Sequence, residues 1–173
     1  MKSDTIAAIA TALSDAGIGI IRISGPEAIA VANRVVVNKK KEHTLKNWQT
    51  HTIHYGFVEE NGTILDEVMV SVMKAPRSYT TEDTVEINCH GGVLLTKRVL
   101  EAVLHAGARM AEPGEFTKRA FLSGRIDLSE AEAVMDLIQA KNQFSMQASI
   151  KQLRGSVAEK VKSLRAALLY EIA

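Results

Sequence analysis

Short runs of alternating apolar and polar residues dominate the first part of the chain. Side chains of a β-strand point alternately to opposite faces, so such runs predict strands. The expected strands cover residues 5–10, 17–23, 51–58, 64–72 and 84–90, with a last short one in "ARMAE". Asn61-Gly62 separates two of these runs, and this pair is a strong signal for a two-residue hairpin turn.

Two helices are expected between these strands. "SGPE" predicts a helix start, with Ser24 as the N-cap, Pro26 in the first turn and an end near Val35. Gly91-Gly92 opens a second helix that ends near His105, followed by Gly107. The pattern therefore predicts a domain of mixed α and β structure over residues 1–118.

The pattern changes after Pro113, where strand signals stop. Glu115 is expected to start a short helix that Gly124 ends in a left-handed conformation. A capping box, either Asp127 with Glu130 or Ser129 with Glu132, then starts the next helix. Apolar residues follow at helical spacing, at Val134, Leu137, Ile138, Ile150, Leu153, Val157, Val161, Leu164 and Leu168. We predict that residues 119–173 begin an all-α domain, which makes the fold class α+β.

The last helical pattern has no Gly, Asn or Pro to close it. We therefore expect the chain to be a piece of a longer protein, whose missing part or a second subunit completes the helical arm.

Composition narrows the class of protein. The 173 residues have room for one ordinary domain and an appendage, and 46% hydrophobic residues suffice for a packed core. A net charge of +1 gives no overall case for nucleic-acid binding, although a local basic patch is compatible with it. A single cysteine, Cys89, excludes an intramolecular disulfide and indicates a reducing cytoplasm. The N-terminal apolar run is too short and too interrupted for a signal peptide or a membrane span.

Arg22 and Glu86 are the first candidate binding residues. Arg22 lies in an apolar strand directly before a helix start, where it could hold a carboxylate, face solvent or pair with a nearby acid. In "TVEINCHGG", Glu86, Asn88 and His90 fall on one strand face. That face is either exposed or lines a pocket, in which a carboxylate suits a ligand with paired N–H donors, such as a pterin ring.

Other features of the chain carry weaker signals. Lys118, Arg119 and Arg125 are either solvated helix-end charges or an anion clamp that works with Arg22. Cys89 is expected to be a small buried hydrophobe, and the histidines show no metal-ligand spacing. No Gly is followed by Lys, so the chain holds no P-loop for GTP or ATP.

Four segments taken together resemble a known family. "DTIAAIAT", "GIGIIRISGP", "APRSYTTEDTVEINCHGG" and "GARMAEPGEFTKRAFLSGRIDLSEAEAVMDLIQA" are similar, in order, to the N-terminal part of the bacterial tRNA uridine modification GTPases called MnmE or TrmE. The resemblance implies a domain like the folate-binding domains of one-carbon enzymes, followed by the first helices of a helical domain. A Ras-like G domain, which in the family interrupts the helical domain and holds GTP, Mg²⁺ and K⁺, is missing here.

The resemblance also implies ligands and partners. In the family this domain forms a homodimer and binds a tetrahydrofolate derivative, 5-formyl- or 5,10-methylene-tetrahydrofolate. The full-length GTP-hydrolysing enzyme works with the flavoprotein MnmG, or GidA, and adds an aminomethyl or carboxymethylaminomethyl group to the wobble uridine of tRNA. This chain alone is not expected to complete that reaction, so no catalytic residue is assigned to it. No metal ligand and no membrane partner are assigned to it either.

Carried over by motif, the folate contacts are Arg22, Glu86 and Arg125. Arg125 stands where the family often has Lys, which keeps the charge but changes its geometry. The family's Gly-rich loop is altered here to "ATALSDAGIG", with Ser14, Asp15 and Ala16 where Gly is frequent. Fewer glycines make positive φ less accessible to this loop. Two alternatives remain open: a stand-alone folate-dependent one-carbon transferase, and a dimerisation scaffold without a ligand.

Overall fold

The computed structural model describes residues 4–172, and the side chains of residues 156–159, 171 and 172 lie outside that description. The chain forms two compact units, Met1–Phe116 and Thr117–Ala173, and each is described by itself. The boundary expected after residue 118 lies close to this division, and the assignment of residues 1–118 and 119–173 to separate domains stays a prediction.

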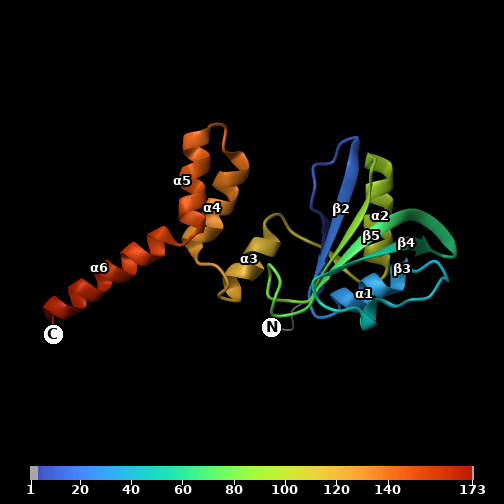
Figure 1. The fold of residues 1–173 in the computed structure, drawn as a ribbon, viewed down its shortest axis with the longest axis horizontal. Coiled ribbons are helices and arrows are strands. Elements are labelled where there is room, and N and C mark those ends of the chain that lie inside the picture. The colour runs from blue at the N-terminus through green and yellow to red at the C-terminus, as the bar shows by residue number, and fades with distance from the viewer. Residues whose placement is uncertain (1–3, 173) are drawn as a thin grey trace. The chain divides into compact units, whose positions relative to one another are not determined.

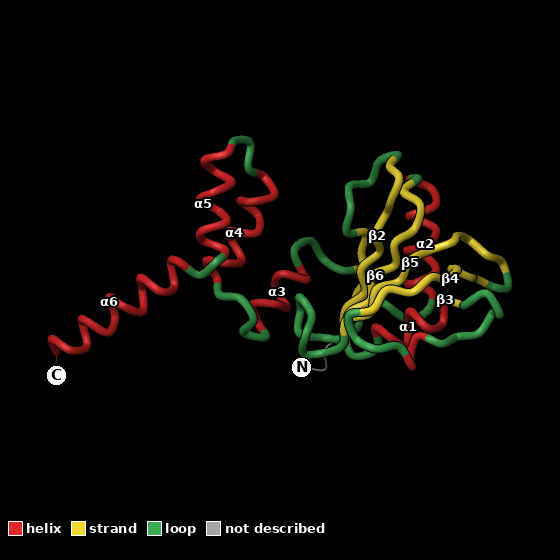
Figure 2. Tube along the Cα trace, viewed as in Figure 1, coloured by secondary structure: helices red, strands yellow, loops and turns green. Residues whose placement is uncertain are grey.

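The first unit is built on a mixed sheet of seven strands (Figures 1 and 2). The strands are β1 (Ile6–Ile9), β2 (Ala16–Ser24), β3 (Val36–Val37), β4 (Thr52–Glu60), β5 (Thr63–Met73), β6 (Thr84–Gly91) and β7 (Arg109–Met110). Their order across the sheet is β3-β4-β5-β6-β2-β1-β7, and all neighbours are antiparallel except the parallel pair β1–β7. The α+β class and most of the expected strands are confirmed.

Helices α1 (Ala28–Val35) and α2 (Val93–His105) pack against the sheet, and a 3₁₀ turn, η1 (Leu45–Asn47), adds Leu45 to the core. Val31 and Val103 come from the two helices, and Ile21 and Ile87 come from the central strands; all four are fully buried. Side chains alternate along each strand, so the neighbouring residues point to the opposite face of the sheet. We call that opposite face, which carries Arg22, Glu86, Ile53, Tyr55, Met69 and Asn88, the open face.

The predicted N-cap of the first helix is wrong. Ser24 is still the last residue of β2, and α1 begins at Ala28 after Glu27, which makes no side-chain cap. The Ser24 hydroxyl is instead used by a distant loop, bonding Thr80 Oγ1 at 2.6 Å and donating to Glu82 Oε2 at 2.8 Å. A long-range hydrogen-bond network has replaced the local cap.

Helix α3 (Glu115–Leu122) starts in the first unit, and the second unit continues with α4 (Leu128–Gln139), α5 (Gln143–Leu153) and α6 (Ser156–Ile172). The predicted left-handed Gly124 is confirmed at φ 75°, and Asp127 with Glu130 makes the capping box. The structure breaks the long C-terminal pattern at Gly155, φ 80°, into α5 and α6. The side chain of Val157, expected on the apolar stripe, lies outside the described residues.

The exposed apolar side chains on the described part of α6 include Val161, Leu164, Leu168 and Leu169. Over residues 4–172, none of the helices has the combination of length and hydrophobicity needed to cross a bilayer.

Candidate functional site

Arg22 and Glu86, predicted separately, lie directly opposite each other on β2 and β6. Arg22 Nε donates to Glu86 Oε1 at 2.8 Å, and the two side chains are 32% and 22% exposed. Their strand neighbours point into the core, so both polar side chains project onto the open face. The interpretation of Arg22 as a residue paired with a nearby acid is therefore confirmed, and its partner is the other candidate residue.

The Arg22–Glu86 pair lies in a defined row across the sheet. Ala8 is opposite Arg22 on one side, and Ser71 is opposite Glu86 on the other. The guanidinium carbon of Arg22 lies 5.7 Å from the ring centroid of Phe116. An aromatic face under a guanidinium holds it flat and adds a modest cation–π attraction.

Hydrogen-bonding capacity is left over at this pair. Within residues 4–172, Glu86 Oε2 and the two terminal nitrogens of Arg22 make no further hydrogen bond or ion pair. An ionised carboxylate accepts on both oxygens, and a guanidinium has five N–H donors. The pair can therefore offer one free acceptor and several donors, side by side, to a polar group above the sheet.

The loop before β6 is held next to this row by hydrogen bonds between hydroxyl side chains. Ser24, Thr80 and Thr84 are buried, and Thr80 Oγ1 lies within hydrogen-bonding distance of both other hydroxyls. Ser24 is the second residue after Arg22, and Thr84 is the second before Glu86, so the loop is attached to the same two strands. The sequence pattern predicts no strand or helix between residues 72 and 84, and hydroxyl residues give no sign of a partner so far along the chain.

Arg125 belongs to the second unit and is exposed there, in the turn after α3. Its backbone N–H donates to the Ala120 carbonyl at 3.0 Å. It lines a hollow of about 470 Å³ together with Asp127, Glu130 and Lys162. Lys118, which is exposed, and Arg119, which is half-buried, lie on α3 of the same unit. The joint action of these residues with Arg22 stays a prediction.

The altered N-terminal loop adopts an ordinary backbone. None of the positive φ angles in residues 4–172 falls between residues 10 and 24. The loop is instead joined to β2 by a hydrogen bond from Ile20 N to Thr11 Oγ1 at 3.2 Å. Replacement of glycines by Ser14, Asp15 and Ala16 therefore imposes no backbone strain in this conformation.

Further along the open face, His90 meets Asp66. The carboxylate of Asp66 accepts from the His90 backbone N–H at 2.8 Å and lies 2.7 Å from its Nδ1. The hydrogen bond to Asp66 and its charge raise the pKa of the exposed His90 imidazole above its usual range. His90 also borders a hollow of about 340 Å³, lined in addition by Ile18, Tyr55 and Asn88.

Cys89 is 3% exposed, and its thiol donates to the Gly19 carbonyl at 3.3 Å, which confirms its expected role as a buried small residue. Burial raises the pKa of this thiol, so Cys89 is a poor nucleophile. Over the described part of the chain, no group of three or more His, Cys, Asp or Glu side chains is placed to hold a metal ion.

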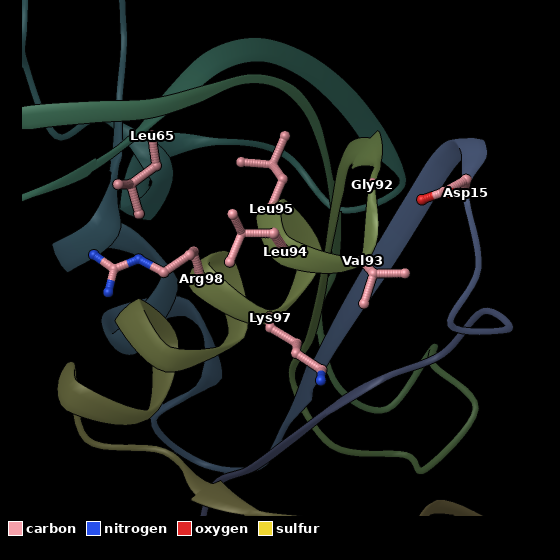
Figure 3. A pocket seen from close by; sticks show the side chains of 8 residues that line it. All are labelled: Asp15, Leu65, Gly92, Val93, Leu94, Leu95, Lys97 and Arg98. Carbon is pink, nitrogen blue, oxygen red and sulfur yellow. The ribbon is translucent and has the colours of Figure 1, made fainter.

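A separate hollow of about 670 Å³ lies at the start of α2 (Figure 3). Its walls include Leu65 from β5 and Leu94, Lys97 and Arg98 from α2. Leu94 is 76% exposed, and Arg98 is held by Glu60 at 3.2 Å. Neither Arg22 nor Glu86 lines this hollow.

Comparison with known proteins gives a consistent result. A family model described as "GTP-binding protein TrmE N-terminus" matches residues 5–125. The whole chain is 58% identical to a protein named tRNA modification GTPase MnmE from Lachnoclostridium phytofermentans and 53% identical to one of that name from Listeria welshimeri. A third, from Bacillus subtilis, is 51% identical over 98% of the chain. The chain spans only 38%, 37% and 37% of the length of these relatives.

Proposed function

Since the chain belongs to the MnmE/TrmE family and corresponds to its N-terminal domain, we propose that it is the folate-binding and dimerisation module of a tRNA modification GTPase. The observation that carries the proposal is the half-satisfied Arg22–Glu86 pair on the open face.

The chemistry of this pair suits a reduced folate. A pterin ring presents adjacent N–H donors, which the free Glu86 oxygen can accept, and its carbonyl and the ligand's carboxylates are acceptors for Arg22. The ligand would be 5-formyl- or 5,10-methylene-tetrahydrofolate, which supplies a one-carbon unit when bound. Arg22 and Glu86 would bind and orient it, and Arg125 is proposed as a further contact for one of its acceptor groups.

The activity of the whole protein is also a proposal. With a flavoprotein partner of the MnmG or GidA type, it would add an aminomethyl or carboxymethylaminomethyl group to the wobble uridine of tRNA in the cytoplasm. GTP, Mg²⁺ and K⁺ would bind to a G domain, which lies outside this chain. The module itself would hold the folate and join two copies.

Homodimerisation is supported by apolar side chains on the open face. Ile18, Ile53 and Met69 are 61%, 62% and 45% exposed on the strands β2, β4 and β5. Exposed apolar side chains gathered on one face of a sheet are typical of a surface that another protein covers. A second copy of the chain would bury them.

Calorimetric titration with 5-formyl-tetrahydrofolate tests the folate proposal. We expect saturable binding to the wild type and a loss of at least tenfold in affinity in Glu86→Gln, which replaces a charged acceptor by a neutral amide. Arg22→Gln should also weaken binding, because it removes the guanidinium donors. Glu101→Gln is the matched control, since Glu101 is a carboxylate on α2, outside the open face.

Equal affinity in the wild type and Glu86→Gln would refute the assignment of the site. Absence of binding in a sample shown to be folded and dimeric by light scattering would leave the scaffold alternative. Transfer of the one-carbon unit to an acceptor by this chain alone, without a G domain, would favour the stand-alone transferase.

A further inference from the structure

A lysine-rich loop follows β3, at the edge of the open face. We infer that this lysine loop, residues 38–43, binds the phosphate backbone of RNA without reading its sequence. It holds Lys39, Lys40 and Lys41 in succession, and all three are exposed. The inference goes beyond the folate site, although the choice of RNA as partner rests on the proposed function.

The loop is held in one shape by its first residue, Asn38. The Asn38 side-chain oxygen accepts from the backbone N–H groups of Lys40 at 2.8 Å and Glu42 at 3.0 Å. The backbone of Asn38 bonds those of Lys41 at 2.9 Å and Glu42 at 3.0 Å. A loop fixed in this way presents its charges with less loss of backbone entropy on binding than a flexible tail would.

The loop keeps an excess of positive charge, because its three lysines outnumber its one acid. Among residues 4–172, none of the three lysines forms an ion pair with a carboxylate. The one acid of the loop, Glu42, accepts instead from the Asn38 amide at 2.9 Å. Because the whole chain carries a net charge of only +1, this is a local concentration of positive charge.

The loop is also joined to the sheet by an aromatic ring. The Lys39 ammonium lies 5.2 Å from the ring centroid of Tyr55, and the Tyr55 ring meets Phe57 edge to face at 5.4 Å. The nearby Glu67 carboxylate raises the pKa of the Tyr55 phenol and places one negative charge beside the rings. Lys39 is therefore placed over Tyr55, while Lys40 and Lys41 extend from the loop.

A polyanion with exposed phosphates fits this surface better than an acidic protein does. Lysine is depleted at the cores of protein–protein interfaces, which use aromatic residues, Met and Arg. Phosphate contacts, in contrast, are made by Lys and Arg and carry no sequence information. The cations of the loop are all lysines, which bind phosphate as point charges and lack the two-pronged donor geometry of Arg, so we expect contact with the backbone.

Fluorescence anisotropy with a tRNA anticodon stem-loop tests the inference on the 173-residue chain. We compare the wild type with the triple variant Lys39→Gln/Lys40→Gln/Lys41→Gln over a range of salt concentrations. Three lost phosphate contacts should reduce the slope of log K against log salt by about 2, and should weaken binding at least tenfold at about 0.1 M salt. Stem-loops of different sequence should bind equally.

Three controls make the result specific. Lys39→Arg/Lys40→Arg/Lys41→Arg keeps the charges and should retain binding. Lys151→Gln/Lys160→Gln/Lys162→Gln removes equal charge from exposed positions of the second unit and should have the smaller effect. The folate titration on the loop variant should be unchanged, which separates failure of this inference from failure of the folate site.

Several outcomes would overturn the inference. Unchanged RNA affinity in the triple Gln variant would do so, and so would equal losses in the two triple Gln variants, which would mean that only net charge matters. Binding of poly-glutamate as tight as that of RNA, lost in the same loop variant, would assign the loop to an acidic protein instead.

Discussion

The loop beside the Arg22–Glu86 pair holds a strained residue, and its replacement should stabilise the protein. Thr81 has φ 62°, in the left-handed region that a β-branched residue rarely adopts. It lies between Thr80 and Glu82, both of which bond Ser24. The network that fastens the loop thus imposes this conformation on a residue that disfavours it.

The size of the effect follows from two opposing terms. The left-handed conformation costs a non-glycine residue about 1–2 kcal/mol, and glycine avoids this cost. Glycine in turn loses about 0.5–1 kcal/mol more conformational entropy on folding. Thr81→Gly should therefore raise the free energy of unfolding by about 0.5–1 kcal/mol. Thr81→Ala, which loses the side chain but keeps the strain, should not stabilise, and the difference between the two variants isolates the backbone term.

Two other positions with similar backbone angles serve as comparisons. Lys41 has φ 59° and Asn61 has φ 51°, but neither is β-branched, and Asn tolerates this region. Urea unfolding followed by circular dichroism should rank the gains on substitution by Gly in the order Thr81, Lys41, Asn61. Destabilisation by Thr81→Gly, or a larger gain at Asn61 than at Thr81, would refute the account of strain.

Other changes test packing and charge in the same unit. A Cβ at Gly91 would meet the backbone carbonyl of residue 16, so Gly91→Ala should cost about 2–3 kcal/mol in urea unfolding, whereas Gly92→Ala, where space is open, should cost less than about 1 kcal/mol. Asp66→Asn should return the raised pKa of His90 towards about 6.5 in an NMR titration. Since the folded-state pKa exceeds the unfolded one, the stabilisation by the Asp66 pair is present in full below about pH 6.5 and is lost as pH rises through the folded-state value; equal pH profiles of stability for the wild type and Asp66→Asn would contradict this. Arg109→Met removes a guanidinium that donates to the Asp4 carboxylate at 2.6 Å and to the Glu115 carboxylate of α3 at 2.8 Å, and it should lower Tm more than Arg109→Lys, which keeps the charge. Equal losses would show that the charge contributes nothing and that only the guanidinium geometry matters.

Much of the fold could be predicted because its signals are local. Alternation located β4 and β5, and Asn61-Gly62 located the turn between them, where both residues have positive φ. The start and end of α2 and the capping box at Asp127 were equally visible in the sequence. In each case the residues that specify the element lie within it or directly beside it.

The errors arose where distant residues decide the structure. Ser24 has the local features of an N-cap, but its hydroxyl bonds residues more than 50 positions away in the chain. The two-residue strand β3 continues directly from α1 and is defined only by its pairing with Val58 and Phe57. The break at Gly155 was missed for a different, local reason: the apolar spacing continues from Leu153 to Val157 across it, and the glycine was not taken as a helix end.

The Arg22–Glu86 pair depends on a register that the sequence specifies only in part. Sliding β6 by one residue past β2 would expose Val85 and Ile87, so burial excludes every odd shift. A shift of two residues would keep those side chains inside and would place Asn88 or Thr84 opposite Arg22. The close approach of Gly91 to residue 16 and the bonding of Ser24 to Thr80 act against such a shift, because both depend on the present register. Gly91, Ser24 and Thr80 therefore fix the register that places the Glu86 carboxylate 2.8 Å from Arg22 Nε, although they contact neither charge. Substitutions at Gly91 should consequently weaken ligand binding as well as lower stability.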